Sequence, residues 1–166
     1  MSQRSSELAR QFEEAVTEFI KVVQGCSDAE WAAVCNAEGW TVAQTAQHVS
    51  GQFPFEMAFI TAAAEARAMP TVTWAELNAL NDGRAGRNIS VSRAQVLEEM
   101  KTGAPSVAAY IRDLSDEQLQ RTGRLSLADG AVVTTEQLIE GPVLTAHIIG
   151  HLESIRGATV RSASLV

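Results

Sequence analysis

Four stretches of the sequence place apolar residues at three- and four-residue spacing, which is the period of an amphipathic α-helix. The stretches cover about residues 6–24, 41–67, 92–114 and 134–156. In the first of them, Leu8, Phe12 and Phe19 fall on one such stripe. A chain of 166 residues is long enough for one sizeable core. The pattern therefore predicts an all-α four-helix bundle that occupies residues 1–166 as a single domain.

Short motifs mark where several helices begin. The pattern S/T-x-x-E/Q, a capping box, occurs at Ser27, Thr41 and Ser92. We expect a short helix after Ser27 and long helices after the other two. A further short helix is expected to open at Ser115.

Two prolines fall inside predicted helices. Pro54 lacks a backbone donor, so it is expected to kink or interrupt the helix over residues 41–67. Pro142 follows Gly141 within the last stretch, and that helix is expected to restart with Pro142 in its first turn.

Three smaller features complete the predicted fold. Residues 74–84 indicate an extra helix with Trp74, Leu77 and Leu80 facing inward, ended or loosened by the glycines that follow. Residues 124–133 contain Asp129-Gly130, a two-residue turn signal between apolar residues, and predict a small β-hairpin. The small, polar segment 158–166 is expected to fray.

Charge and composition exclude several classes of function. Thirteen basic and twenty acidic residues give a net charge of −7, which opposes binding to nucleic acid. No apolar run is long enough for a membrane span, and Met1–Arg10 lacks the apolar region of a secretory signal. We therefore expect a cytoplasmic protein with a small-molecule substrate. Cys26 and Cys35 are expected to be reduced thiols.

The chain has only three histidines, and all of them fall in predicted helices. His147 and His151 are spaced i, i+4, so their side chains share one helix face, and His48 lies in the second long helix. Three convergent imidazoles bind a divalent metal ion and leave a coordination position open, as in catalytic sites. Gln44 and Gln52, one turn either side of His48, are candidates to orient its ring or touch a substrate. The residues alone leave open the alternative that the three histidines only pack in the core.

Two segments resemble a known family. Gly39-Trp40-Thr41-Val42 with Gln47-His48-Val49, and the segment TEQLIEGPVLTAHIIGHLESI over residues 135–155, are similar to the second and last core helices of the DinB-like (DinB/YfiT-like) family of metal-dependent enzymes. The resemblance implies a four-helix bundle, often a homodimer. It also implies that His48, His147 and His151 are the ligands of a divalent ion, with zinc, nickel and iron all acceptable to imidazole.

The resemblance further implies a function. Relatives include transferases that use low-molecular-weight thiols such as bacillithiol or mycothiol, and proteins described only as hydrolases. The leading hypothesis is a thiol-dependent S-transferase that acts on electrophiles. A metal-dependent hydrolase and a non-enzymatic metal- or ligand-binding stress protein are the alternatives. In the mycothiol-using isomerase branch the first residue of the final pair can be Glu, whereas this chain has His147.

Catalytic residues beyond the metal site are not assigned from the sequence. The polar candidates near the expected site are Glu56, Asn81, Asp82 and Arg84. Of these, Arg84 is suited to hold a substrate carboxylate as a bidentate donor. Trp40, Trp74 and Phe55 are candidates to line a pocket.

Overall fold

The computed structural model of the chain describes residues 2–87 and 91–163, with the backbone alone for residues 84–87 and 161–163. In chain order the elements are α1 (Gln3–Gly25), α2 (Asp28–Trp31), β1 (Val34–Cys35), β2 (Trp40–Thr41), α3 (Val42–Gly51), α4 (Phe53–Ala64), α5 (Trp74–Arg87), α6 (Arg93–Asp113), α7 (Asp116–Gln120), β3 (Thr122–Leu125), the 3₁₀ turn η1 (Ser126–Ala128), β4 (Ala131–Thr134), α8 (Thr135–Glu140) and α9 (Thr145–Ala163).

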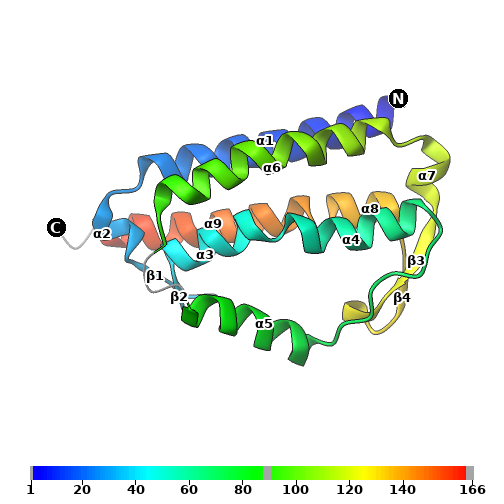
Figure 1. Ribbon diagram of the computed structural model, residues 1–166. Helices are drawn as coiled ribbons and strands as arrows, with labels where there is room; N and C mark the ends of the chain where they lie inside the picture. The colour runs from blue at the N-terminus through cyan, green and yellow to red at the C-terminus, as the bar shows by residue number, and fades with distance from the viewer. Residues whose placement is uncertain (1, 88–90, 164–166) are drawn as a thin grey trace.

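Four helical segments form the bundle that the periodicity predicts. Helix α1 packs along α6 and α9, and α3 packs along α6 and α9 from the other side. Figure 1 shows α1 and α6 side by side, with α3–α4 and α8–α9 each forming a broken helix beneath them. Helix α5 stands to one side of this bundle, between the β1–β2 and β3–β4 hairpins.

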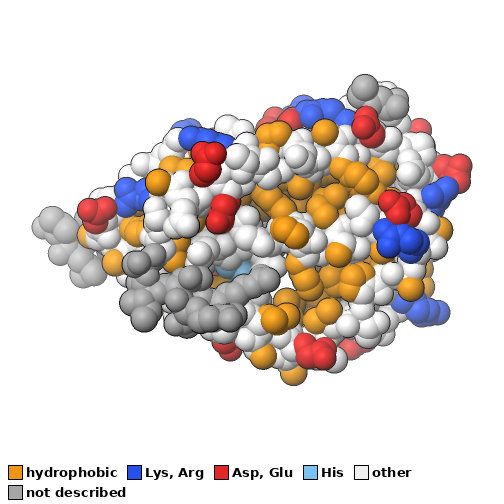
Figure 2. All heavy atoms as spheres, in the orientation of Figure 1, with side chains coloured by type: hydrophobic (Ala, Val, Ile, Leu, Met, Phe, Trp, Pro, Cys, Tyr) orange, Lys and Arg blue, Asp and Glu red, His pale blue; other side chains and the backbone are white. Residues whose placement is uncertain are grey.

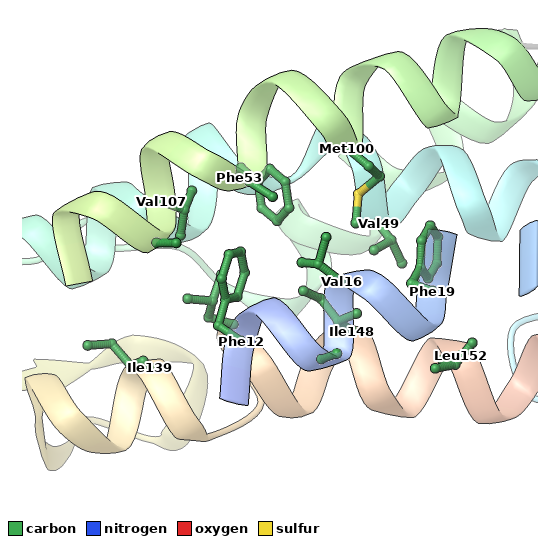
Figure 3. Close-up of a cluster of buried hydrophobic side chains, with 14 of the residues drawn as sticks. Phe12, Val16, Phe19, Val49, Phe53, Met100, Val107, Ile139, Ile148 and Leu152 are labelled. Atoms are coloured by element: carbon green, nitrogen blue, oxygen red, sulfur yellow. The ribbon is translucent and has the colours of Figure 1, made fainter. Parts of the chain in front are cut away.

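The core is built from the apolar stripe of each long helix. Phe12 and Phe19 of α1 are fully buried, and the Phe12 ring meets the Phe53 ring edge to face with centroids 5.8 Å apart. In Figure 3 these side chains face Met100 of α6 and Ile148 of α9 across the bundle interior. The packed stripes bring α3 and α9, the two histidine-bearing helices, against each other.

The capping motifs position the helices as predicted. The Thr41 side chain accepts a hydrogen bond from the Gln44 backbone N–H and starts α3, while Ser27 caps α2 in the same way. The predicted break at Pro54 is confirmed. Helix α3 ends at Gly51 and α4 begins at Phe53 with this proline in its first turn, where the missing N–H costs nothing.

Helix α5 differs from its prediction in two ways. It continues to Arg87, so the glycines after residue 82 do not end it. Trp74 and Leu80 are 60% and 49% exposed and do not face a core. Leu77 instead lines a cavity described below. The inward-facing prediction was wrong for Trp74 and Leu80 because α5 stands beside the bundle, packed mainly against α3, and has no full interior face.

The predicted hairpin is present but its connection is longer than two residues. Strands β3 and β4 pair antiparallel, with Thr122 opposite Thr134 and Leu125 opposite Ala131. The 3₁₀ turn η1 lies between the strands, and Asp129 and Gly130 close the connection in the left-handed region, with φ values of 53° and 75°.

The end of the chain differs from expectation as well. The last long helix restarts at Thr145 and not at Pro142, because Gly141–Leu144 form a turn between α8 and α9. Helix α9 then continues to Ala163, so the segment expected to fray after residue 158 is helical to that point.

Gly141 makes this turn possible, and its replacement tests the packing there. A Cβ at Gly141 would lie 2.5 Å from the Gln137 carbonyl oxygen, a backbone atom that cannot move aside cheaply. We expect Gly141→Ala to lower the free energy of unfolding by about 1–3 kcal/mol in urea titrations. Gly150→Ala is the control, because a Cβ there meets nothing within 4 Å on the exposed face of α9. It should be neutral or stabilise by up to about 1 kcal/mol. Equal losses in both variants would contradict the steric argument.

Candidate metal centre

The bundle brings all three histidines together. His48 comes from α3, and His147 and His151 lie one turn apart on α9. The Nε2 atom of His147 lies 3.0 Å from Nε2 of His48 and 3.0 Å from Nε2 of His151. One nitrogen from each ring lies within 4.8 Å of the others, so all three rings face a common point.

Each ring is held from behind by a different polar side chain. His48 Nδ1 lies 3.1 Å from the Gln52 amide nitrogen, and His151 Nδ1 lies 2.8 Å from Glu38 Oε1. His147 Nδ1 lies 2.6 Å from Glu56 Oε1. The last pair is a close contact without hydrogen-bond geometry, and neither polar group has another hydrogen-bond partner among the described residues.

These outer contacts decide which nitrogen can bind a metal. A neutral imidazole carries its proton on one nitrogen and offers a lone pair on the other. An acceptor behind Nδ1 holds the proton there, so the Nε2 lone pair points to the common centre. For His48 the Gln52 amide must present its oxygen to the ring, the reverse of the orientation in the structure. The donor set therefore fits a metal ion.

The spacing of the ring nitrogens also fits. Two nitrogens bound at 2.0–2.1 Å to a tetrahedral ion are about 3.3 Å apart. The observed separations of 3.0 Å need only a small outward shift of the rings to reach that value. These three residues are the ones that could hold the ion.

Burial controls the charge at the centre. It lowers the pKa of His151, and the nearby His147 lowers it further, while Glu38 acts in the opposite direction. The neutral ring is therefore favoured, and only a neutral ring can bind a metal. Burial raises the pKa of Glu56, and His147 opposes this change. Trp40 packs edge-on against His48, with ring centroids 5.3 Å apart, and shields it from solvent.

A cavity of about 520 Å³ opens beside the histidines. All three histidines contribute to its lining, together with Trp40, Phe55 and Trp74, as the sequence predicts. Figure 2 shows a histidine at the bottom of a hollow that hydrophobic side chains border. This volume is in the range of small-molecule sites.

The polar candidates fall in different places. Asn81 and Asp82 line the cavity, and Asn81 Oδ1 accepts a hydrogen bond of 3.2 Å from the Gln52 amide. The side chain of Arg84 lies outside the described residues. Glu56 lies beside His147, with its Oε1 2.6 Å from Nδ1 of that ring.

Sequence reasoning missed Glu38. It lies in the turn between β1 and β2. In the structure its carboxylate bridges His151 and the Ser154 hydroxyl, which donates to it at 2.5 Å. Glu38 lies in the turn of a two-stranded hairpin and contacts His151 and Ser154, which are spaced i, i+3 on α9. No motif in the sequence predicts this contact. Gln44 forms the cap with Thr41, so Gln52 is the glutamine behind His48.

The structure also places one glycine and both cysteines. Gly150, one residue before His151, lies on the exposed face of α9. Cys26 and Cys35 are buried and are not joined in a disulfide, which agrees with the expectation of reduced thiols.

The fold and the site together define a class of protein. It is a four-helix bundle that presents three imidazole nitrogens from two helices to a cavity of small-molecule size. The sequence model of the DinB superfamily matches residues 11–155, which is most of the chain. The chain belongs to the DinB superfamily.

One solved structure shares this fold over nearly the whole chain. YfiT from Bacillus subtilis is described as a probable metal-dependent hydrolase with an unusual four-helix bundle topology. It superposes with a TM-score of 0.73 at 18% identity, covering 98% of this chain and 90% of YfiT. At that identity the similarity establishes the fold alone. Among curated proteins, no sequence matches the chain significantly.

The length and apolar character of the helices bear on membrane insertion. Within residues 2–87 and 91–163, none of them combines the length and the apolar character that a membrane span requires.

Proposed function

We propose that this protein is a metal-dependent enzyme for small molecules, in which His48, His147 and His151 bind one divalent ion through Nε2. The observation that carries the proposal is the orientation of the three rings. Their Nε2 atoms face a common point, and each Nδ1 lies against Gln52, Glu56 or Glu38. Histidines that only packed in a core would have no reason to share this orientation.

Three protein ligands leave at least one coordination position open toward the cavity. When bound, the ion would act as a Lewis acid on water, on a thiol or on the substrate itself. Zinc, nickel and ferrous iron are all compatible with a set of three imidazoles.

The chain's own residues do the remaining work. Glu56 is 4% exposed and its Oε1 lies 2.6 Å from His147 Nδ1, so its carboxylate is suited to orient that ring and to make its Nε2 a stronger ligand. Trp40 and Phe55 add aromatic surface to the cavity, and Trp40 packs against His48. The Gln52 amide contacts both the His48 ring and the Asn81 amide, so it links the orientation of His48 to helix α5.

Two reactions fit this arrangement. Hydrolysis is supported by the coordination position that three imidazole ligands leave open for water and by the description of YfiT as a probable metal-dependent hydrolase. Transfer of a low-molecular-weight thiol to an electrophile is supported by the open coordination position, where a bound ion would hold sulfur as a thiolate, and by cavity walls that suit an apolar electrophile. A homodimer and a cytoplasmic location remain predictions from the sequence.

Metal content comes first in the test of this proposal. After purification and reconstitution with zinc, nickel or iron, elemental analysis should find about one equivalent of metal per chain. A content below about a tenth of an equivalent would overturn the metal site, because a preorganised set of three imidazoles retains its ion through mild purification.

Turnover then separates the two reactions. A panel of small esters and amides without thiol tests hydrolysis, and an electrophile with several thiols tests transfer. The His151→Ala variant is the background control in both. A loaded protein that turns over nothing faster than this variant would be a metal-binding protein and not an enzyme.

A further inference from the structure

The cavity beside the histidines is polar at one end and apolar along most of its length. The polar groups next to the rings, Glu38, Gln52 and Glu56, are already in contact with the imidazoles. Further polar side chains come from α5, where Asn78, Asn81 and Asp82 line one side. Most of the other described lining residues are aromatic or aliphatic.

The apolar wall is assembled from four separate parts of the fold. Phe55 and Phe59 come from α4, Leu77 comes from α5, and Leu127 comes from the connection between β3 and β4. Val143 adds the turn between α8 and α9. Elements that are distant in the sequence thus converge on one apolar surface that leads away from the metal centre.

Specific hydrogen bonds hold this wall in place. The backbone N–H of Val72 donates to the Ser126 hydroxyl at 3.0 Å, and that hydroxyl donates back to the Val72 carbonyl at 2.8 Å. Two residues later in the chain, the Trp74 indole N–H donates to the Leu127 carbonyl at 2.9 Å. The indole is 60% exposed yet anchored at the edge of the cavity. These bonds fasten the start of α5 to the β3–β4 connection.

We propose that the site takes a ligand with a metal-binding head and an uncharged apolar chain or ring, the head at the histidines and the chain along the wall of Phe55, Phe59, Leu77, Leu127 and Val143. This inference rests on the proposed function, since the head needs the metal. An apolar chain removes both its own surface and that of the wall from water. A charged tail of similar length would lose hydration against these side chains and find no compensation there.

The proposal predicts a dependence of affinity on chain length. Burial of one methylene strengthens binding about fourfold. On the zinc-reconstituted protein, n-alkyl hydroxamates from acetohydroxamate to octanohydroxamate should bind about fourfold more tightly per added methylene, until the chain reaches the cavity mouth. Isothermal titration calorimetry measures each dissociation constant.

Two variants on the same helix locate the chain. Leu77→Gln places an amide in the wall and should flatten the chain-length dependence, with acetohydroxamate affinity unchanged. Leu80→Gln is the matched control, because Leu80 is 49% exposed, lies three residues further along α5 and does not line the cavity. It should keep the wild-type slope.

The outcomes separate this inference from the function it rests on. If acetohydroxamate does not bind the zinc-loaded protein, the open coordination position of the proposed function fails. If acetohydroxamate binds and longer chains gain nothing, the metal site stands and the apolar-chain inference is overturned. A wild-type slope in Leu77→Gln would also overturn it, because the chain would then lie elsewhere. If Leu77→Gln does not fold, the wild-type series alone decides.

Discussion

Chelation of the bound ion is expected to lower Tm by roughly 8–16 °C in the metal-reconstituted protein. The ion would join α3 to α9, two helices that are distant in the sequence, through His48 on one and His147 and His151 on the other. A ligand that binds only the folded state at a concentration a thousand times its Kd stabilises it by about 4 kcal/mol. For a domain of this size each kcal/mol shifts Tm by about 2–4 °C.

The control for this experiment is the His147→Ala variant. His147 Nε2 lies 3.0 Å from both of the other ring nitrogens, so its loss removes the central member of the cluster. The variant should melt at the same temperature with zinc and with chelator. A wild-type protein that holds one equivalent of metal but shows no shift on chelation would mean that the ion does not cross-link the bundle.

Removal of the carboxylate behind His147 is expected to weaken metal binding 10- to 100-fold. Glu56 is buried, and its Oε1 lies 2.6 Å from His147 Nδ1. With an ion on Nε2, the Nδ1 proton faces this carboxylate, whose negative charge makes the ring a stronger ligand. Glu56→Gln keeps the shape and an acceptor but loses the charge. Competition for zinc with a fluorescent chelator measures the change.

The metal-free form of this variant provides the decisive control. Burial raises the pKa of Glu56, which means that the folded state disfavours the ionised carboxyl. The cost to stability appears as the pH rises above the ordinary carboxyl pKa of about 4.3. At neutral pH, Glu56→Gln removes this cost, so metal-free stability should stay constant or rise while metal affinity falls. A residue with a merely structural role would lower both.

Glu38→Gln allows a comparison at the second carboxylate. Glu38 also accepts a hydrogen bond from Ser154, so part of its role is to hold the β1–β2 turn against α9. We expect its replacement to weaken metal binding as well, with the metal-free Tm falling in the same experiment. Comparison of the two variants shows whether each carboxylate affects metal affinity alone or also the stability of the metal-free fold.

Helix starts could be predicted because their causes are local. The capping box at Thr41 needs only residues three apart, and it begins α3 where the motif places it. Pro54 interrupts the long helical stretch for an equally local reason, the missing backbone N–H. The exposure of Trp74 and Leu80 could not be predicted in this way, because it depends on how few elements pack against α5.

The amino-acid sequence by itself determined the four amphipathic stripes, the helix caps and the placement of three histidines on two of those helices. Periodicity, capping and i, i+4 spacing act within a few residues, so they can be recognised without a structure. Only the tertiary structure decided that Glu38, Gln52 and Glu56 lie behind the three rings and that an apolar wall leads away from them. Those contacts join turns and helices far apart in the chain, and their geometry depends on how the helices pack.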